Sequence, residues 1–260
     1  LRIFLRFSPI QHIIVLLFSV KGCPKHSGSF FSWKVSYFYM QFDSMNFSPT
    51  TLRAIEALGY SEMTPIQEAA IPLLLEGRDV IGRSATGTGK TAAFGLPIIE
   101  RTAENAQAGP QALILCPTRE LCMQICEELR SLAQFKPEIK ITAIYGGRPM
   151  QPQVAALKRG AQVVVATPGR LLDHMSHRTI RLDKVKIAVL DEADEMLDMG
   201  FFKDVRKILD RLPKQNQMVM FSATISREVM DIGWLYQRAT RRRLSSARLR
   251  TMSRRSSNTV

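Results

Sequence analysis

Short apolar runs rich in β-branched residues alternate with longer amphipathic stretches between residues 79 and 237. The apolar runs span 79–83, 112–116, 139–145, 162–166, 187–190 and 218–221. Between them, a helical pattern of apolar positions covers 89–105, 118–134, 150–158, 169–175, 201–212 and 226–236. Nearly continuous apolar strands that alternate with helices predict an α/β fold, in which helices sandwich a parallel sheet. In that architecture ligands bind at the carboxyl ends of the strands.

Composition and charge assign the middle of the chain to a folded domain and set its two ends apart. The 260 residues are 45% hydrophobic and 23% charged, as in ordinary globular chains. The formal charge of +13 comes from the ends, because 1–41 and 238–260 hold basic residues and no acidic ones. Residues 42–237 are neutral overall. The pI of about 10.0 therefore gives no argument that the central domain binds nucleic acid.

The amino-terminal segment, residues 1–41, places arginines before an apolar run over 10–20. This order imitates a secretory signal, but the run is too short to cross a bilayer as a helix, and no small-residue cleavage site follows. We interpret the segment as a disordered or spurious extension, with the natural start at Met40 or nearby, and we expect no membrane partner. A signal or membrane anchor is the alternative.

The carboxyl-terminal segment, residues 238–260, is almost entirely Arg, Ser, Ala, Thr, Leu and Met. We expect it to be disordered. An RNA-binding arm and a shifted reading frame both explain this composition, and the sequence leaves the two open.

The four cysteines have neither the paired spacing of a zinc site nor the density of a disulfide-stapled domain. They are Cys23, Cys116, Cys122 and Cys126. We expect buried, reduced thiols, which are typical of a cytoplasmic protein.

A glycine-rich turn follows the apolar run 79–83 and opens the next helix. Its sequence is Ser84-Ala85-Thr86-Gly87-Thr88-Gly89-Lys90-Thr91. The glycines permit a tight turn that aims several N–H groups at one point, and the helix N-terminus adds partial positive charge. The pattern predicts an ATP-phosphate loop, in which Lys90 reaches the β- and γ-phosphates and Thr91 ligates Mg²⁺. Ser84 stands where the generic loop begins with Gly.

Three carboxylates follow the apolar run 187–190, in the sequence Asp191-Glu192-Ala193-Asp194. Such a cluster at a strand tip is costly unless a cation compensates it. We expect Mg²⁺ between Asp191 and the phosphates, with Glu192 orienting and deprotonating the attacking water. Lys90, Asp191 and Glu192 are thus the predicted catalytic residues, converging across neighbouring strand tips. The alternative is an acidic helix start favoured by the helix dipole.

The sequence Asp-Glu-Ala-Asp resembles the signature of the DEAD-box ATP-dependent RNA helicases, bacterial members included. Residues 59–67 are similar to the Q motif of that family, with Phe42 as the isolated upstream aromatic. Four further motifs occur in order: Pro117-Thr118-Arg119-Glu120-Leu121 (Ia), Gly146-Gly147 (GG), Thr167-Pro168-Gly169-Arg170 (Ib) and Ser222-Ala223-Thr224 (III). The resemblance covers 42–237 and implies a RecA-like domain of the P-loop NTPase class, the first of two in the family.

The resemblance also implies a role for each motif. Gln67 would select adenine through its amide, and Phe42 would stack on the base. Motifs Ia, GG and Ib would hold the RNA backbone with little sequence selectivity, with Arg148 as a lesser candidate. Motif III and Asp194 would couple the ATP site to the closed, RNA-bound state.

The second RecA-like domain of the family supplies arginine fingers, which are typically worth about 10³–10⁵ in rate. The residues after 224 leave no room for such a domain. We therefore expect this chain to bind ATP, Mg²⁺ and RNA weakly, to hydrolyse ATP slowly and not to unwind duplexes. A non-enzymatic RNA- or partner-binding fragment is the alternative, and a DNA translocase is disfavoured by the Q motif and by Asp194. The RNA substrate stays open.

Overall fold

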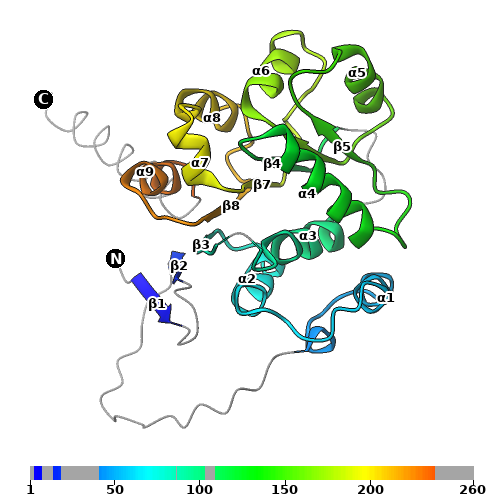
Figure 1. Cartoon of the computed structure of the whole chain (residues 1–260), viewed down its shortest axis with the longest axis vertical. Helices are drawn as coiled ribbons and strands as arrows, with labels where there is room; N and C mark the ends of the chain where they lie inside the picture. The colour runs from blue at the N-terminus through cyan, green and yellow to red at the C-terminus, as the bar shows by residue number, and fades with distance from the viewer. Residues whose placement is uncertain (1–2, 8–13, 19–40, 86, 103–108, 238–260) are drawn as a thin grey trace, which may run out of the picture.

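The computed structural model describes residues 3–7, 14–18, 41–85, 87–102 and 109–237 (Figure 1). In this part of the chain one sheet has the strand order β1-β2-β3-β8-β7-β4-β6-β5. The strands are β1 (Ile3–Phe7), β2 (Ile14–Phe18), β3 (Val80–Arg83), β4 (Ala112–Leu115), β5 (Ile141–Ile144), β6 (Val163–Ala166), β7 (Ile187–Leu190) and β8 (Gln217–Ser222). Strands β3 to β8 pair in parallel, so the α/β prediction is confirmed.

Two strands of the amino-terminal segment continue the sheet beyond β3. Strand β2 pairs antiparallel with β3, with Leu16 opposite Ile81, and β1 pairs antiparallel with β2. The rest of 1–40 and all of 238–260 lie outside the described residues, so the interpretation of these two segments stays a prediction.

Helices cover both faces of the parallel strands (Figure 1). They are η1 (Phe42–Ser44), α1 (Pro49–Ala57), α2 (Pro65–Leu75), α3 (Lys90–Arg101), α4 (Arg119–Leu132), α5 (Met150–Lys158), α6 (Pro168–Ser176), α7 (Ala193–Asp198), α8 (Phe202–Leu209) and α9 (Arg227–Tyr236). The six predicted helices are present, whereas α1, α2 and the short α7 were not predicted. Within the described ranges, no helix has the length and apolar character needed to cross a bilayer.

Alternate residues of each of the strands β3 to β8 pack into two hydrophobic clusters on opposite faces of the sheet. On β4, Ala112 and Ile114 join the cluster with α1 to α4, whereas Leu113 and Leu115 join the cluster with α6 to α9. Because both faces are covered, all four positions of β4 are buried. A large side chain buried in this way contributes about 1.5–3 kcal/mol. Cys116, Cys122 and Cys126 are buried and free, as predicted, and Cys23 lies outside the described residues.

A partly buried polar network fastens α1 to α3. Ser48 Oγ and Thr51 Oγ1 donate hydrogen bonds of 2.8 and 2.6 Å to Glu100 Oε2. Lys136 Nζ lies 3.3 Å from the same oxygen. Burial raises the pKa of Glu100, but the hydrogen bonds from Thr51 and Ser48 and the charge of Lys136 outweigh it, so this pKa is lowered. The network holds α1, and with it the segment leading into 59–67, against the domain.

We expect Glu100→Gln to lower the free energy of unfolding by about 1–3 kcal/mol at pH 7, because hydrogen bonds to a charged acceptor are lost. The folded pKa of Glu100 lies below its ordinary value of 4.5. The ionised carboxylate therefore stabilises the fold above that pH, and the contribution is lost as the pH falls through the folded pKa. Urea denaturation at pH 7 and at acidic pH measures this. A difference that is constant with pH would contradict the assignment.

Candidate nucleotide and nucleic-acid site

The carboxyl ends of β3, β8 and β7 lie side by side and carry the glycine turn, motif III and the carboxylate cluster, respectively. The glycine turn and the cluster were expected at neighbouring strand tips, and this detail is wrong. Strand β8 lies between β3 and β7, with Val219 paired to Val80 on one side and Val189 on the other. The reason is topological, since the last strand of the sequence inserts between two earlier ones.

Lys90 and Asp191 nevertheless meet across this edge of the sheet. Lys90 Nζ lies 3.6 Å from Asp191 Oδ1, and the two side chains are only 6% and 4% exposed. The ammonium has no hydrogen-bond acceptor among the residues that the structure describes. Burial raises the pKa of Asp191 to about 6, although the charge of Lys90 lowers it. A buried ammonium without an acceptor suits an anionic ligand, and a carboxylate that burial disfavours suits an added cation.

The glycine turn has the backbone that a phosphate loop requires. Gly87 and Gly89 have φ of +75° and +83°, in the left-handed region, and α3 begins at Lys90 directly after them. The hydroxyl groups of Ser84 and Thr88 are hydrogen-bonded, and Thr88 Oγ1 donates to Ala85 O at 2.9 Å. A serine at the start of the turn thus braces it internally. Thr86 lies outside the described residues.

Gln67 is buried against the glycine turn. Its Oε1 accepts a hydrogen bond of 2.9 Å from Thr64 N, and its Nε2 donates one of 3.1 Å to Gly89 O. A Cβ atom added to Gly89 would lie 2.6 Å from Gln67 Nε2. Both ends of the amide that was predicted to read adenine therefore have protein partners here. The amide keeps a second N–H and a second oxygen lone pair, and these are the groups that remain for a base.

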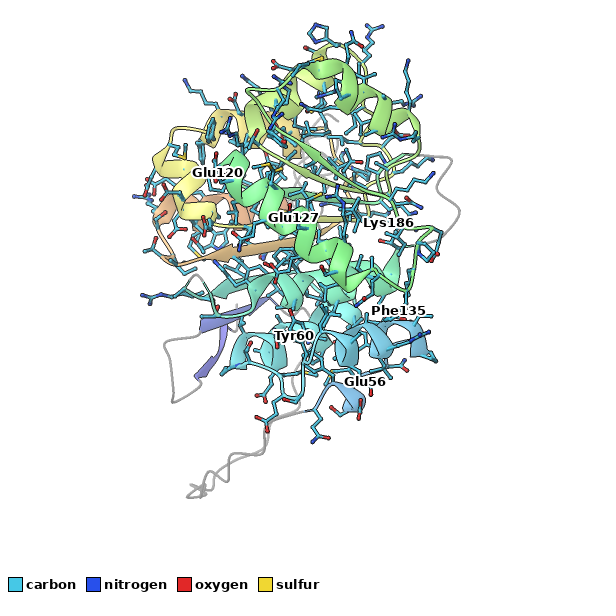
Figure 2. The ribbon with its side chains drawn as sticks, turned by 45° about the vertical axis from the view of Figure 1, so that its right-hand side comes forward. Glu56, Tyr60, Glu120, Glu127, Phe135 and Lys186 are labelled. Carbon is cyan, nitrogen blue, oxygen red and sulfur yellow. The ribbon has the colours of Figure 1, made fainter. Side chains whose placement is uncertain are left out.

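Phe42 is buried too, with 2% of its surface exposed. Its ring stacks on Tyr60 with the centroids 6.2 Å apart and the planes 25° from parallel (Tyr60 is labelled in Figure 2). Tyr60 lies within the Q-motif stretch and was not singled out from the sequence. The role of Phe42 in stacking on a base stays a prediction.

Thr91, the predicted Mg²⁺ ligand of α3, lies near Glu128 of α4. Burial raises the pKa of Glu128, and Thr91 lowers it only in part. No sequence pattern pointed to Glu128, which lies on an ordinary amphipathic helix. Among the described residues, no three His, Cys, Asp or Glu side chains form a potential metal cluster. Mg²⁺ does not need one, because it is usually held by one or two carboxylates together with phosphates and water.

Glu192 adopts the left-handed conformation, with φ 51° and ψ 53°, at the start of α7. Its N–H donates a hydrogen bond of 3.0 Å to Asp191 Oδ1. Positive φ is uncommon in residues other than glycine, and such strain concentrates at functional sites. The conformation turns the chain sharply between the strand tip and α7, so that two carboxylates stand at the end of β7.

Motif III joins the two halves of this edge. Ser222 O accepts a hydrogen bond of 2.9 Å from Ser84 N, and Ser222 Oγ accepts one of 3.1 Å from Asp194 N. Thr224 donates from its N–H and its hydroxyl to Asp194 Oδ2, at 2.7 and 2.8 Å. Burial raises the pKa of Asp194, but the hydrogen bonds of Ser222 and Thr224 outweigh it and the pKa is lowered. Ala223 O accepts from Arg83 Nε at 3.1 Å. Motif III thus bridges the glycine turn and the carboxylate cluster.

The tips of β4, β6 and β5 bring motifs Ia, Ib and GG together. A Cβ atom on Gly147 would lie 3.3 Å from Arg119 Nη1, and Arg170 Nη1 donates a hydrogen bond of 2.9 Å to Arg148 O. Space is open beside Gly146 and Gly169, where an added Cβ would meet no atom within 4 Å. The three motifs therefore form one continuous surface at this edge.

Several side chains of this surface already have partners. Thr118 Oγ1 accepts a hydrogen bond of 3.2 Å from Leu121 N and caps α4, directly after Pro117. Arg119 Nε lies 2.7 Å from Glu120 Oε1, at the start of α4 (Figure 2). In motif Ib, Thr167 is the N-cap residue of α6 and Pro168 is its first residue. These contacts are local. The N–H of Thr167 also has a partner, since it donates a hydrogen bond of 3.0 Å to Ile144 O, and Pro117 and Pro168 have no N–H.

A buried polar chain beneath this surface was not predicted. His174 of α6 is fully buried, and its Nε2 lies 3.3 Å from Gln153 Oε1. Gln153 Nε2 in turn donates a hydrogen bond of 3.1 Å to Tyr145 O, next to the GG motif. Burial lowers the pKa of His174, and the charge of Arg170 lowers it further. This chain of hydrogen bonds links motif Ib to the GG loop. It was not predicted because a single His on an apolar helix face does not indicate such a chain.

The described domain is an α/β protein of the RecA-like class, with a glycine turn, a lysine and a carboxylate cluster at one edge of the sheet, on strands β3 and β7 that flank β8. The family model of the DEAD/DEAH box helicases matches residues 64–232. The chain therefore belongs to the DEAD/DEAH box helicase family.

Similar proteins agree with this assignment. An ATP-dependent RNA helicase CshA of Limosilactobacillus reuteri is 48% identical over 194 residues, which are 75% of this chain and 39% of that protein. A second CshA, of Listeria monocytogenes serovar 1/2a (strain ATCC BAA-679 / EGD-e), is 47% identical over 193 residues, covering 74% and 37%. The crystal structure of a DEAD box protein from the hyperthermophile Methanococcus jannaschii has a TM-score of 0.71 and 45% identity, and the match covers 76% of this chain and 54% of that one. The chain thus spans about two fifths of the curated relatives.

We expect Ser222→Ala to lower the free energy of unfolding by about 1–3 kcal/mol, because the partly buried N–H of Asp194 loses its acceptor. Thr224→Val removes one exposed hydroxyl and leaves the Thr224 N–H bond in place, so about 1 kcal/mol or less is expected. Urea denaturation of the two variants measures both values. Equal costs would show that Ser222 does not hold α7 to β8.

Proposed function

We propose that this domain binds ATP with Mg²⁺ at the tips of β3, β8 and β7, and the RNA backbone at the tips of β4, β6 and β5. The carrying observation is the buried Lys90–Asp191 pair, whose ammonium has no acceptor among the described residues. The identity to ATP-dependent RNA helicases supports the same reading. RNA-dependent ATP hydrolysis coupled to unwinding is the activity that we propose for the complete protein.

Each residue of the ATP site has a proposed role. Lys90 binds the β- and γ-phosphates, and the backbone N–H groups of 86–89 surround them. Thr91 and Asp191 hold Mg²⁺, which when bound neutralises charge on the phosphates. Glu192 orients the attacking water and accepts its proton.

We assign adenine selection to Gln67 and stacking on the base to Phe42. This assignment is supported by the contact of Gln67 with Gly89, which ties the base-reading residue to the phosphate loop. Motif III and Asp194 couple the ATP site to the closed, RNA-bound state, since Ser222 contacts both the glycine turn and α7.

RNA binding falls to Pro117, Thr118, Arg119, Gly146, Gly147, Thr167, Pro168, Gly169 and Arg170. The open space beside Gly146 and Gly169 supports close approach of a sugar-phosphate backbone to protein N–H groups. Contacts of this kind carry little sequence information, so we propose weak sequence selectivity.

Hydrolysis by this chain alone is proposed to be slow, because arginine fingers come from a second RecA-like domain in the family and are worth about 10³–10⁵ in rate. A cytoplasmic location is proposed with it. The alternative is a non-enzymatic RNA- or partner-binding fragment, and the variants below separate the two.

We expect Lys90→Met to weaken binding of a fluorescent ATP analogue with Mg²⁺ by about 10- to 100-fold, the loss of a charged hydrogen bond. Lys184→Met is the matched control, because Lys184 is exposed and lies in the loop before β7. Fluorescence titration measures both. Equal affinities for the two variants would contradict the ATP site.

Glu192→Gln is expected to slow single-turnover ATP hydrolysis by about 10²–10⁴-fold, because the general base is lost, and to leave ATP binding intact. Glu195→Gln serves as the control, since Glu195 is exposed on α7. An ATP-dependent effect on RNA that survives in Glu192→Gln would favour the non-enzymatic alternative.

A further inference from the structure

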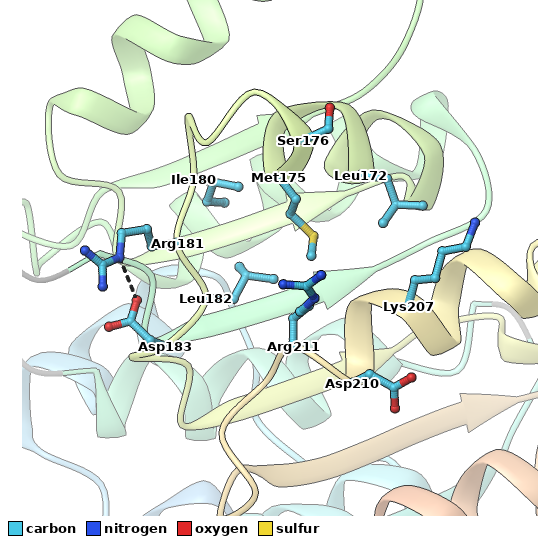
Figure 3. Close-up of a pocket in the computed structure, with 10 residues that line it drawn as sticks. All are labelled: Leu172, Met175, Ser176, Ile180, Arg181, Leu182, Asp183, Lys207, Asp210 and Arg211. Atoms are coloured by element: carbon cyan, nitrogen blue, oxygen red, sulfur yellow. Dashed lines mark ion pairs between the residues drawn. The ribbon is translucent and has the colours of Figure 1, made fainter.

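Two surface cavities of similar size lie outside the ATP site. Figure 3 shows the first, of about 720 Å³, between α6, the loop after it and α8. Two of its three basic groups have acidic partners, since Arg181 lies 3.4 Å from Asp183 and Lys207 lies 3.2 Å from Asp204. Arg211 is in none of the ion pairs among the described residues. The charge of this cavity is largely satisfied within the protein, so it offers little to an anion.

The second cavity, the α4–α5 groove, has about 740 Å³ and lies between α4, β5 and α5. Arg130, Arg148 and Arg159 line it, together with one carboxylate, Glu127, near the middle of α4 (Figure 2). None of the ion pairs among the described residues involves these three arginines. Arg148 and Arg159 are exposed. The groove therefore presents unmatched positive charge, which suits a polyanion.

The edge strand at the base of the groove is poorly suited to pairing with a peptide. Strand β5 is the last in the sheet, and its residues 141, 143 and 145 point their backbone groups away from β6. Ile141 O already accepts from Arg130 Nη2 at 3.0 Å, and Tyr145 O accepts from Gln153 Nε2 at 3.1 Å. Side chains thus occupy the carbonyl groups at the two ends of this edge, which disfavours addition of a further strand.

The groove is continuous with the GG loop. Tyr145, Arg148 and Pro149 line it and flank Gly146-Gly147 in the chain. Helix α5 then runs nine residues from the loop, about 14 Å, and Arg159 follows at its far end. Met123, Pro152 and Ala156 provide apolar surface between the two ends.

We propose that the RNA-binding surface extends from the GG loop along the α4–α5 groove, where Arg148 and Arg159 bind phosphates of the same strand. The apolar wall between them contacts bases or sugars. Glu127 opposes the strand at one point and keeps it towards the arginines of α5. This extension rests on the proposed RNA binding by the GG loop and adds a subsite for nucleotides beyond it.

The test compares Arg159→Ala with Lys203→Ala, a control that removes one exposed charge on α8 outside the groove. Fluorescence anisotropy with labelled oligouridylates of increasing length, at several KCl concentrations, gives the affinity and its salt dependence. The eight arginines of 238–260 are present in every variant and cancel in the comparison. The plot of log K against log salt has a negative slope, and each lost phosphate contact reduces its magnitude by about 0.7 for a single strand.

We expect Arg159→Ala to reduce the magnitude of this slope by about 0.7 for long oligomers and to leave the affinity for the shortest oligomers unchanged. Lys203→Ala is expected to change neither the slope nor the affinity. Crosslinking of 4-thiouridine RNA is expected to label peptides of 145–159. Wild-type binding with an unchanged Arg159→Ala slope and no such crosslink would overturn the groove and leave the proposed function standing. No RNA binding at all would overturn both. Binding of polyglutamate that depends on Arg159 and excludes RNA would assign the groove to an acidic protein.

Discussion

The buried Lys90–Asp191 pair is the constraint on which the site depends. Two charged side chains, 6% and 4% exposed and 3.6 Å apart, have been taken out of water without a hydrogen bond between them. Removing ions from water costs several kcal/mol each, and attraction offsets this only when the geometry is close and further hydrogen bonds are made. The pKa of Asp191 is accordingly raised to about 6, because the effect of burial exceeds the opposing effect of the Lys90 charge. The fold tolerates this cost at a strand edge where, in the proposed function, phosphates bind to Lys90 and a cation binds to Asp191.

Strand β8 explains how such a pair is assembled from segments a hundred residues apart. It separates β3 from β7 and pairs with both, and its last residue contacts the glycine turn and α7 at once. Any shift of the glycine turn therefore acts on α7 through the hydrogen bonds of Ser222. The bridging contacts are short hydrogen bonds between small side chains and backbone, which change discretely because they are either made or lost.

The fold class and the position of the glycine turn and the carboxylates at strand ends were readable from the sequence because their signals are local. An apolar run marks each buried strand, and the glycines of the turn lie beside Lys90. The order of the strands was not readable, since nothing in the run 218–221 says that it inserts between 79–83 and 187–190. The contact of Gln67 with Thr64 is different, because the two form a capping box whose three-residue spacing is a sequence signal. The contacts of Gln67 with Gly89 and of Phe42 with Tyr60 join residues further apart in the chain, and neither periodicity nor spacing encodes those.

The state of Gln67 bears on how selectivity for a base arises. In this structure the amide donates one hydrogen bond to Gly89 O and accepts one from Thr64 N. A second N–H and a second lone pair remain for a base, and each hydrogen bond to the base yields only about 0.5–1.5 kcal/mol net. A base with the wrong donor and acceptor pattern leaves a buried amide group unpaired, at a cost of about 1–3 kcal/mol. Discrimination at Gln67 thus comes mainly from the penalty on wrong bases. The contact with Gly89 makes that penalty depend on the conformation of the phosphate loop.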